Sequence, residues 1–222
     1  MSQNSLHVGL IMDGNGRWAK QKKQARIFGH KQGLLAFKNI IDYAAKNEEI
    51  SQITAFALSR DNLKRSAVEI QALIGILHSV LQNELEWFCE GHVAVNFIGD
   101  LSYFSNETRV GLKQFTEQTN QGSALKLNIA LNYSGKHDIL ELIRENSHAS
   151  LAEIEAKFLI KDIDLLIRTS GEQRLSDFCL WQLAYAELYF TEVLWPDFAA
   201  TDFEKALLWF KKRERRFGEA HE

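Results

Sequence analysis

The residues best suited to chemistry near the start of the chain form the segment Met12-Asp13-Gly14-Asn15-Gly16-Arg17-Trp18, which directly follows a short apolar run. Its two glycines let a bound group approach the backbone closely, and the backbone amides together with Arg17 suit a diphosphate. Asp13 offers the carboxylate that Mg2+ prefers beside phosphate oxygens. The spacing is neither that of a P-loop nor that of a Rossmann fingerprint. On composition alone, a polar turn containing an Asx motif explains the segment equally well.

A second cationic group follows in the same turn-rich part of the chain. Arg26 and His30 flank Phe28 and Gly29 just before a helical pattern, where a helix N-terminus would add positive potential. With Arg17 they would make one anion-binding pocket. Either residue alone would more often be an ordinary surface residue.

Three more polar features stand beside apolar runs. A mostly polar segment follows the second apolar run: Ser59, Arg60, Asp61, Asn62, Leu63, Lys64 and Arg65. A helix cap is the simpler explanation there. Arg168, Arg174 and Ser176 follow a later run and suit a second diphosphate, because guanidinium groups bind phosphate oxygens in bidentate fashion. Glu187 lies within an apolar and aromatic run, where a metal or an arginine would explain an acid. Two anion sites indicate two phosphorylated substrates.

The elements that must position these residues follow from the pattern of apolar residues. Short apolar runs at 8–12, 53–58, 93–98, 125–131 and 165–167 alternate with longer segments of helical period, which predicts an α/β fold with a mainly parallel sheet. Ligands of such folds collect at the carboxyl ends of strands, where Asp13 and Arg168 stand. Residues 65–90 predict one long helix with an apolar face, for which core packing is the ordinary explanation. The stretch from Phe203 predicts a last helix with a basic end and Gly218 as its stop.

Composition excludes several classes of protein. The 222 residues suit a single domain spanning 1–222, and no linker, repeat or low-complexity segment divides them. Lys and Arg (26) nearly balance Asp and Glu (29), so no global basic field would hold a nucleic acid. The two cysteines favour buried thiols in a reducing, cytoplasmic compartment. We expect no signal peptide or membrane-spanning helix. No residue pattern supports a hydrolase triad or a zinc site.

Five motifs in this order resemble one known family. They are Asp13-Gly14-Asn15-Gly16-Arg17-Trp18-Ala19, Gly29-His30-Lys31-x-Gly33, Arg168-Thr169-x-Gly171-Glu172, Trp181-Gln182-x-Ala184-Tyr185-Ala186-Glu187-Leu188 and Arg213-Glu214-Arg215-Arg216-Phe217-Gly218. Along nearly its whole length the chain resembles cis-prenyltransferases of the undecaprenyl diphosphate synthase family. The resemblance implies a homodimer whose subunits each hold a parallel sheet, surrounding helices and a hydrophobic tunnel. The helix after Arg65 would be a wall of that tunnel.

The resemblance also implies a reaction and residue roles. A Mg2+-dependent enzyme would join isopentenyl diphosphate to an allylic diphosphate, farnesyl diphosphate above all, and make a long polyprenyl diphosphate such as undecaprenyl diphosphate, a precursor of the cell-wall carrier lipid. Asp13 and Glu187 would hold the metal, and Asn62 would handle the proton. The C-terminal tail would reach the partner's site, and product release implies contact with the inner face of a membrane. We assign substrate binding to Gly14, Asn15, Gly16, Arg17, Trp18, Arg26, His30, Ser59, Arg60, Asp61, Leu63, Arg65, Arg168, Arg174, Leu175 and Ser176.

One segment departs from the family pattern and keeps alternatives open. Residues 58–66 lack two aromatics and a proline that members usually carry, while Gln173 and Asp177 replace a usual histidine and asparagine. A short-chain or irregular prenyl diphosphate synthase on the same fold is therefore the first alternative. A non-catalytic partner subunit is a second, although such subunits usually lose the Asp13 motif. An unrelated phosphate-binding α/β domain is the third.

Overall fold

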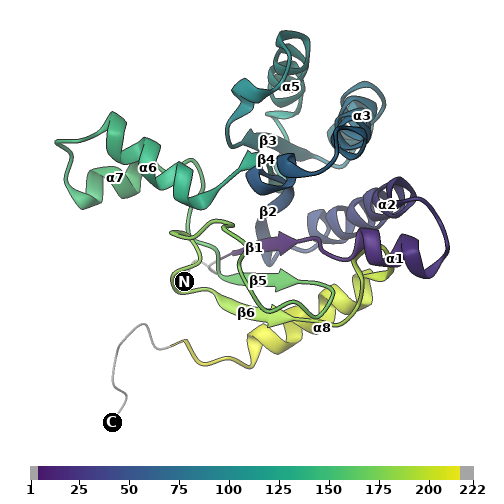
Figure 1. Cartoon of the computed structure of the whole chain (residues 1–222). Helices are drawn as coiled ribbons and strands as arrows, with labels where there is room; N and C mark the ends of the chain where they lie inside the picture. The colour runs from purple at the N-terminus through teal and green to yellow at the C-terminus, as the bar shows by residue number, and fades with distance from the viewer. Residues whose placement is uncertain (1–4, 216–222) are drawn as a thin grey trace.

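The computed structural model describes residues 5–215, and a six-stranded sheet organises them (Figure 1). The strand order is β3-β4-β2-β1-β5-β6, and every neighbouring pair is parallel. The predicted α/β class with a parallel sheet is confirmed. The strands are β1 (Leu6–Ile11), β2 (Ile50–Ser59), β3 (Val93–Ile98), β4 (Leu125–Tyr133), β5 (Leu165–Arg168) and β6 (Glu187–Phe190).

Helices occupy most of the connections between strands. The α-helices are α1 (Asn15–Gln21), α2 (Arg26–Ala45), α3 (Ala67–Asn83), α4 (Leu85–Glu90), α5 (Asn106–Thr119), α6 (Gly135–Glu145), α7 (Leu151–Lys157) and α8 (Ala200–Lys211). Three 3-10 turns, η1 (Arg60–Lys64), η2 (Leu101–Tyr103) and η3 (Trp195–Asp197), complete the described elements. In Figure 1, α6 and α7 form an arm that projects from the body.

The two faces of the sheet carry separate hydrophobic cores because strand side chains alternate between faces. Val8 and Leu10 of β1 belong to the larger core, to which α2, α4, α5 and α8 also contribute buried residues. Ile11 faces the other way and belongs to the smaller core with Phe178 and Cys179, from the loop between β5 and β6. Cys179 is thus buried as predicted, whereas Cys89 is exposed and corrects that prediction. The helices thus cover one face, and that loop covers part of the other.

Two helix predictions need correction. The single helix expected over residues 65–90 is two helices, α3 and α4, which are separated at Glu84. Asn83 donates a side-chain hydrogen bond to the Ser79 carbonyl at 2.9 Å, and Glu84 pairs with Lys38 of α2, so the local bonds favour a break there. The last helix ends at Lys211 rather than at a glycine stop. Gly218, the expected stop, lies outside the described residues.

Candidate active site

Asp13 and Arg168 meet because the sheet places their strands side by side. Ile11 of β1 is in register with Arg168 of β5, and Asp13 follows two residues after Ile11. Arg168 Nη2 donates to Asp13 Oδ2 at 3.0 Å, and the Arg168 side chain is 4% exposed. Its other terminal nitrogen donates to Ser176 Oγ at 2.8 Å and to the Arg174 carbonyl. The two predicted diphosphate segments therefore form one site.

The loop after β1 is held in a conformation that only glycine adopts easily. Gly14 has φ of +107°, and a Cβ there would lie 2.9 Å from the Leu194 side chain. The Gly14 amide donates to Asp13 Oδ1 at 2.7 Å. Thr169 Oγ1 accepts from the Asp13 amide at 3.0 Å and donates to the Asp13 carbonyl at 2.7 Å. The carboxylate is thus fixed from both its loop and the neighbouring strand.

Helix α2 packs directly onto this loop through two glycines. A Cβ at Gly29 would lie 2.0 Å from the Asn15 carbonyl oxygen, and one at Gly33 would lie 2.2 Å from Asn15 Oδ1. Asn15 Nδ2 donates to the Met12 carbonyl at 3.0 Å. The spacing of Gly29 and Gly33 therefore has a steric cause, which is that α2 must approach the loop closely enough to bring His30 into the site.

A cationic cluster stands at the start of α2 and is balanced by an acid that the sequence reading missed. Glu69 of α3 lies 3.4 Å from Arg26 and 2.8 Å from Arg65, and it is 14% exposed. Burial, with Arg65 as the next cause, lowers the pKa of His30 from 6.5 to about 4, so the imidazole is neutral at pH 7. In this state Glu69 provides the negative charge that a bound diphosphate would bring. An acid in the first turn of a predicted helix looks like helix capping, which is why its role was not foreseen.

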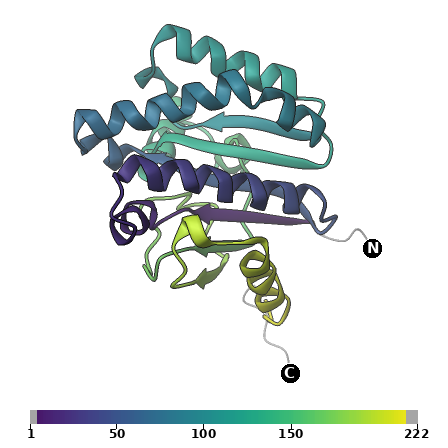
Figure 2. The same ribbon diagram turned by 90° about the vertical axis from the view of Figure 1, so that its right-hand side faces the viewer.

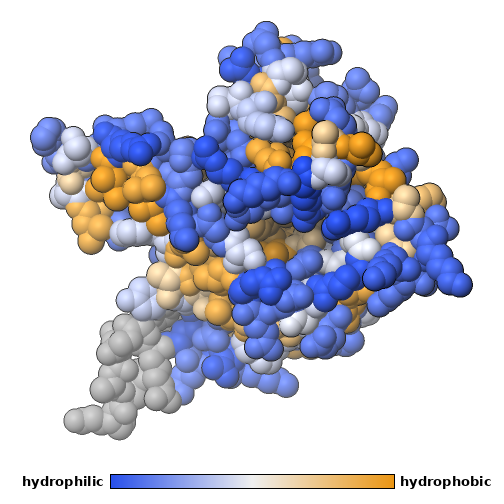
Figure 3. Space-filling view, viewed as in Figure 1, coloured by the Kyte–Doolittle hydropathy of each residue, from blue (hydrophilic) through white to orange (hydrophobic). Residues whose placement is uncertain are grey.

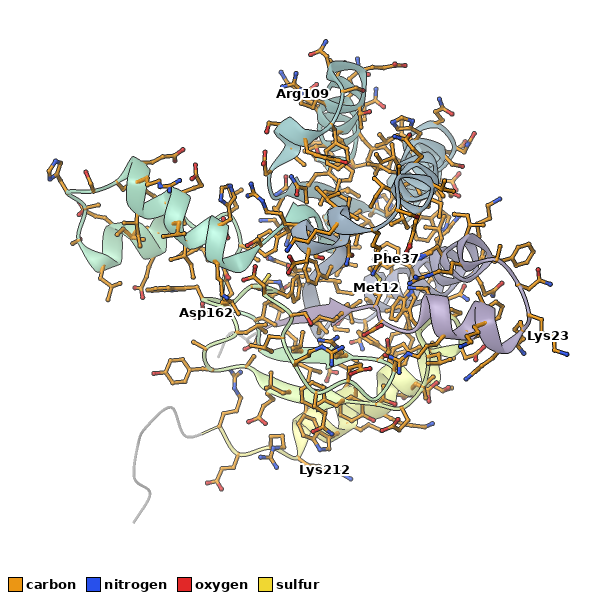
Figure 4. The ribbon with its side chains drawn as sticks, viewed as in Figure 1. Met12, Lys23, Phe37, Arg109, Asp162 and Lys212 are labelled. Atoms are coloured by element: carbon orange, nitrogen blue, oxygen red, sulfur yellow. The ribbon has the colours of Figure 1, made fainter. Side chains whose placement is uncertain are left out.

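One cavity of about 480 Å³ joins these groups to an apolar interior. Asp13, Arg26, His30, Arg65 and Arg168 are among the polar residues at one end. The rest of the wall is largely apolar and includes Leu34, Phe37, Leu73, Leu77, Val80, Phe88, Phe97 and Ile129. Figure 3 shows a hollow with apolar surface inside and a hydrophilic rim, and Figure 4 labels Met12 and Phe37, two wall residues near the centre of the molecule. The arrangement suits a ligand with an anionic head and a hydrocarbon tail.

Twelve of the predicted site residues line this cavity. They are Asp13, Gly14, Asn15, Gly16, Arg26, His30, Ser59, Asn62, Arg65, Arg168, Arg174 and Ser176. Ser59 and Asn62 also cap η1 reciprocally, through bonds of 3.0 and 3.3 Å, so the helix-cap explanation holds for both. Arg17, predicted to share one pocket with Arg26 and His30, does not line the cavity; it contacts Ser170 and lies 3.3 Å from Glu172.

The other predicted substrate-binding residues do not line the cavity. Trp18 donates to Asp197 Oδ1 at 2.7 Å, while Asp61 pairs with Lys64 on the exposed side of η1. Leu63 packs against the larger core and Leu175 against the smaller one. Arg60 begins η1 and is also absent from the cavity wall.

Glu187 and Asp13 lie at opposite ends of the sheet within one chain. Glu187 begins β6 beside Leu165, the first residue of β5, whereas Asp13 follows the carboxyl end of β1. Arg213 Nε donates to Glu187 Oε2 at 3.0 Å, so an arginine accounts for this acid in the described chain. Over residues 5–215, no three His, Cys, Asp or Glu side chains gather as a metal site. A site containing both acids therefore needs a second subunit.

Comparisons with known proteins agree with this geometry. Residues 11–218 match the family described as "Putative undecaprenyl diphosphate synthase". A farnesyl-diphosphate-specific ditrans,polycis-undecaprenyl-diphosphate synthase of Pasteurella multocida is 43% identical over 97% of this chain and 95% of its own length.

Two solved structures share the fold. A lavandulyl diphosphate synthase from Lavandula x intermedia, in complex with dimethylallyl diphosphate, has a TM-score of 0.91 and 31% identity, covering 99% of this chain and 100% of that one. A "probable undecaprenyl diphosphate synthase" from Campylobacter jejuni has a TM-score of 0.84 and 30% identity, covering 97% and 100%. The chain, with its glycine-rich loop, paired arginine segment and apolar cavity, belongs to the undecaprenyl diphosphate synthase family of prenyltransferases.

Proposed function

We propose that this enzyme is a Mg2+-dependent cis-prenyltransferase that adds isopentenyl diphosphate to farnesyl diphosphate and makes a long polyprenyl diphosphate. The observation that carries the proposal is the cavity of about 480 Å³ in which two cationic segments meet around Asp13 and the remaining wall is largely apolar. The name of the Pasteurella relative supports both the farnesyl primer and the undecaprenyl product. Such a product would be the precursor of a carrier lipid for cell-wall polysaccharides.

The allylic diphosphate is proposed to bind between the loop after β1 and the start of α2. Gly14, Asn15 and Gly16 line the cavity together with Arg26 and His30. Its hydrocarbon tail would follow the apolar wall between α2 and α3, which removes about 0.8 kcal/mol of unfavourable hydration per buried methylene. The diphosphate would displace Glu69 as the partner of Arg26 and Arg65.

Isopentenyl diphosphate is proposed to bind at Arg168, Arg174 and Ser176. The two terminal nitrogens of Arg168 already donate to Ser176 and Asp13, and its Nε is buried without a hydrogen-bond partner among the described residues. Arg174 is exposed and pairs with Glu172, so its guanidinium can turn toward an incoming phosphate. This placement puts the two diphosphates on either side of Asp13.

The residues present fit a magnesium ion whose remaining ligands come from the substrate. Mg2+ in phosphoryl and diphosphate sites commonly uses one or two carboxylates together with phosphate oxygens and water. Asp13, whose side chain is 31% exposed, supplies one such carboxylate in the cavity. Bound there, the ion would stabilise negative charge on the departing diphosphate. Glu187 of a second subunit is the proposed further ligand.

In the reaction, the bond between the allylic C1 carbon and its diphosphate oxygen breaks while the terminal carbon of isopentenyl diphosphate bonds to that C1. A proton then leaves C2 of the isopentenyl unit to form the new double bond. Arg26 and the loop amides would stabilise the charge that develops on the leaving oxygen. Asn62, whose amide lines the cavity and accepts the Ser59 amide proton at 3.3 Å, is proposed to handle the lost proton.

We propose a homodimer built through the α6–α7 arm. Leu140, Ile143 and Leu151 on this arm are 51%, 46% and 61% exposed, and Figure 3 shows apolar surface gathered there. Gln182 near the base of the arm is 2% exposed, yet neither side-chain polar atom has a hydrogen-bond partner among the described residues. A second subunit would cover the apolar face and bring Glu187 and the C-terminal tail toward the site of its partner.

The proposed location is the cytoplasm, with peripheral contact at the inner face of the membrane for product release. Over residues 5–215, no helix has both the length and the apolar character that crossing a bilayer requires. A product with a long hydrocarbon tail would leave the apolar cavity most easily into lipid.

A short-chain or irregular coupling enzyme is the second candidate function. The similarity to the lavandulyl diphosphate synthase favours it, as do the altered residues 58–66. Mass spectrometry of the products formed from labelled isopentenyl diphosphate, with dimethylallyl or farnesyl diphosphate as primer, separates the two. Products that have gained many five-carbon units support the main proposal, and products that have gained only one overturn it.

A further inference from the structure

The segment from residue 14 to residue 41 is strongly basic in a chain that is acidic overall. It contains seven basic residues and no Asp or Glu, whereas the full chain has a formal net charge of -3. The seven are Arg17, Lys20, Lys22, Lys23, Arg26, Lys31 and Lys38. Six of the seven lie on α1, the turn after it and the first half of α2, and Lys38 lies in the second half of α2.

Four of these lysines form an exposed basic surface. Lys20, Lys22, Lys23 and Lys31 are all solvent-exposed, and within residues 5–215 none of the four forms an ion pair. Lys22 lies 5.7 Å from the centre of the Trp18 ring. Figure 4 shows Lys23 at the tip of the turn between α1 and α2, at the edge of the molecule. No carboxylate of this segment neutralises the group.

Large apolar side chains are exposed among these lysines. Phe28 and Leu35 are 53% and 55% exposed, and with Lys31 they form one stripe on α2 at spacings of three and four residues. Val68, in the first turn of α3, is 82% exposed. The Arg26–Glu69 pair joins the first turns of α2 and α3, so Val68 belongs to the same end of the molecule as Phe28 (Figure 2).

The opposite stripe of α2 lines the cavity. Arg26, His30, Leu34 and Phe37 face the substrate site, while Phe28, Lys31 and Leu35 face solvent. The exposed stripe therefore lies on the outside of a cavity wall, beside the polar end where an anionic head would bind. A surface of this kind, with lysines around exposed large apolar side chains, is typical of attachment to anionic lipid.

We infer that this surface, made of Lys20, Lys22, Lys23, Phe28, Lys31, Leu35 and Val68, docks the enzyme on an anionic lipid bilayer. The apolar side chains enter the interface between headgroups and acyl chains, and the lysines bind the lipid phosphates. The apolar patch on the arm lacks this run of unopposed basic residues, so charge distinguishes the two surfaces. The purpose of docking rests on the proposed function, since a membrane is where a long polyprenyl product must go.

The test compares two charge-matched variants in a vesicle co-sedimentation assay. Lys22→Glu/Phe28→Glu alters the proposed surface. Lys113→Glu/Val110→Glu makes the same kinds of change on α5, where Val110 is 46% exposed and the Lys113 side chain 78%. Each protein is mixed with vesicles of phosphatidylcholine alone, or of phosphatidylcholine with phosphatidylglycerol, at low and high salt.

We expect the wild type and the α5 variant to bind the anionic vesicles and to release them in high salt. The Lys22→Glu/Phe28→Glu variant should bind the anionic vesicles at least about tenfold more weakly than the wild type. In detergent, all three proteins should elongate farnesyl diphosphate at similar rates, because neither pair touches the cavity.

Equal vesicle binding by the two variants would overturn the inference, as would tighter binding to duplex DNA than to anionic vesicles. Failure of every protein to elongate in detergent would instead count against the proposed function, and the vesicle result would still decide the docking surface.

Discussion

At the scale of single residues, the site depends on how Arg168 joins its two halves. One side chain holds Asp13 of the loop after β1 and Ser176 of the loop after β5, although 155 residues separate Arg168 from Asp13. Asp13 balances the charge of this guanidinium, but among the described residues its buried Nε has no hydrogen-bond partner, which is costly. The proposed isopentenyl diphosphate would offset that cost.

Asp13→Asn should abolish most of the metal-dependent rate. The variant keeps the shape of the side chain and its contact with Gly14, but it removes the charge proposed to bind Mg2+ and pair with Arg168. We expect kcat to fall by about 100-fold to 1000-fold, the scale seen when one charge-stabilising group of an active site is lost. The control is Asp61→Asn, which neutralises an exposed acid outside the cavity wall and should change kcat less than twofold. Similar losses in both variants would contradict the role of Asp13.

Binding of a diphosphate should draw a proton onto His30. Burial and the neighbouring arginines hold its pKa at about 4 in the free protein, and a nearby dianion should raise it. Calorimetry at pH 6 in buffers of different ionisation enthalpy should therefore report proton uptake on binding the allylic diphosphate. The uptake should disappear in His30→Gln. Equal uptake in that variant would assign the proton to another group.

Sequence alone located most of the polar residues of the cavity wall, because types such as Asp and Arg directly after apolar runs are conspicuous. It could not find Glu69, since the need for a counter-charge appears only when α2 and α3 are packed. It also could not separate Asn62, in the cavity wall, from its neighbour Asp61, which faces solvent.

At the scale of elements, α3 shapes the space for the hydrocarbon tail. Ile70 is its one fully buried residue, while Leu73, Leu77 and Val80 are only partly buried because they face the cavity. Glu84, at the end of α3, forms an ion pair with Lys38 in the same wall. Twelve residues separate Lys38 from Arg26 on α2, about 18 Å along the helix, so the pair lies far from the diphosphate end.

Val80→Phe should shorten the products. The larger ring would fill part of the cavity about four helical turns beyond Arg65, where a growing chain must pass. Mass spectrometry should show fewer added five-carbon units, with little change in the rate of the first addition. The control is Gln82→Phe, two positions along α3 on its exposed side. An unchanged product length in Val80→Phe would mean that chains follow another path.

A buried histidine links three strands and should make stability depend on pH. His7 Nδ1 faces the Asp162 carbonyl at 2.9 Å and therefore donates, so Nε2 accepts from Thr54 at 2.7 Å, and Asn128 donates to the same hydroxyl at 3.0 Å. Burial lowers the pKa of His7 from 6.5 to about 4. In the unfolded chain this histidine takes up a proton below about pH 6.5, whereas in the folded protein it does so only near pH 4. The free energy of unfolding is therefore highest above pH 6.5 and falls as the pH drops toward 4.

The predicted loss from His7 is about 3 kcal/mol between pH 6.5 and 4. Urea unfolding of the wild type and of His7→Gln across this range checks it. The free energy of unfolding should fall less steeply with acid in the variant. Parallel pH profiles would show that His7 does not carry this effect.

Five strands were predicted because buried parallel strands are continuous apolar runs. β6 was missed because it begins with an acid, Glu187. It also lies at an edge of the sheet, where none of its residues is fully buried, so it does not form a continuous apolar run. The break between α3 and α4 was also missed, because it depends on Lys38 from a different helix, and periodicity within 65–90 cannot report that contact.

At the scale of the whole molecule, two features support the proposed dimer: the exposed apolar side chains of the arm, and the position of Glu187 at the opposite end of the sheet from Asp13. Ile143→Glu should place a charge on the exposed apolar face of α6 and disrupt the proposed dimer. Analytical ultracentrifugation should show monomers, with activity at least about tenfold lower, because Glu187 would no longer reach the site of a partner. Val110→Glu on α5 is the matched control and should remain dimeric. A fully active Ile143→Glu monomer would contradict the shared site.

The most direct test of the central claim is elongation by the purified full chain. Incubation with Mg2+, farnesyl diphosphate and labelled isopentenyl diphosphate in detergent should yield long polyprenyl diphosphates. Asp13→Asn should yield almost none, while Asp61→Asn should match the wild type. Folded protein that binds both substrates but forms no carbon–carbon bond between them, with Mg2+ present, would contradict the account.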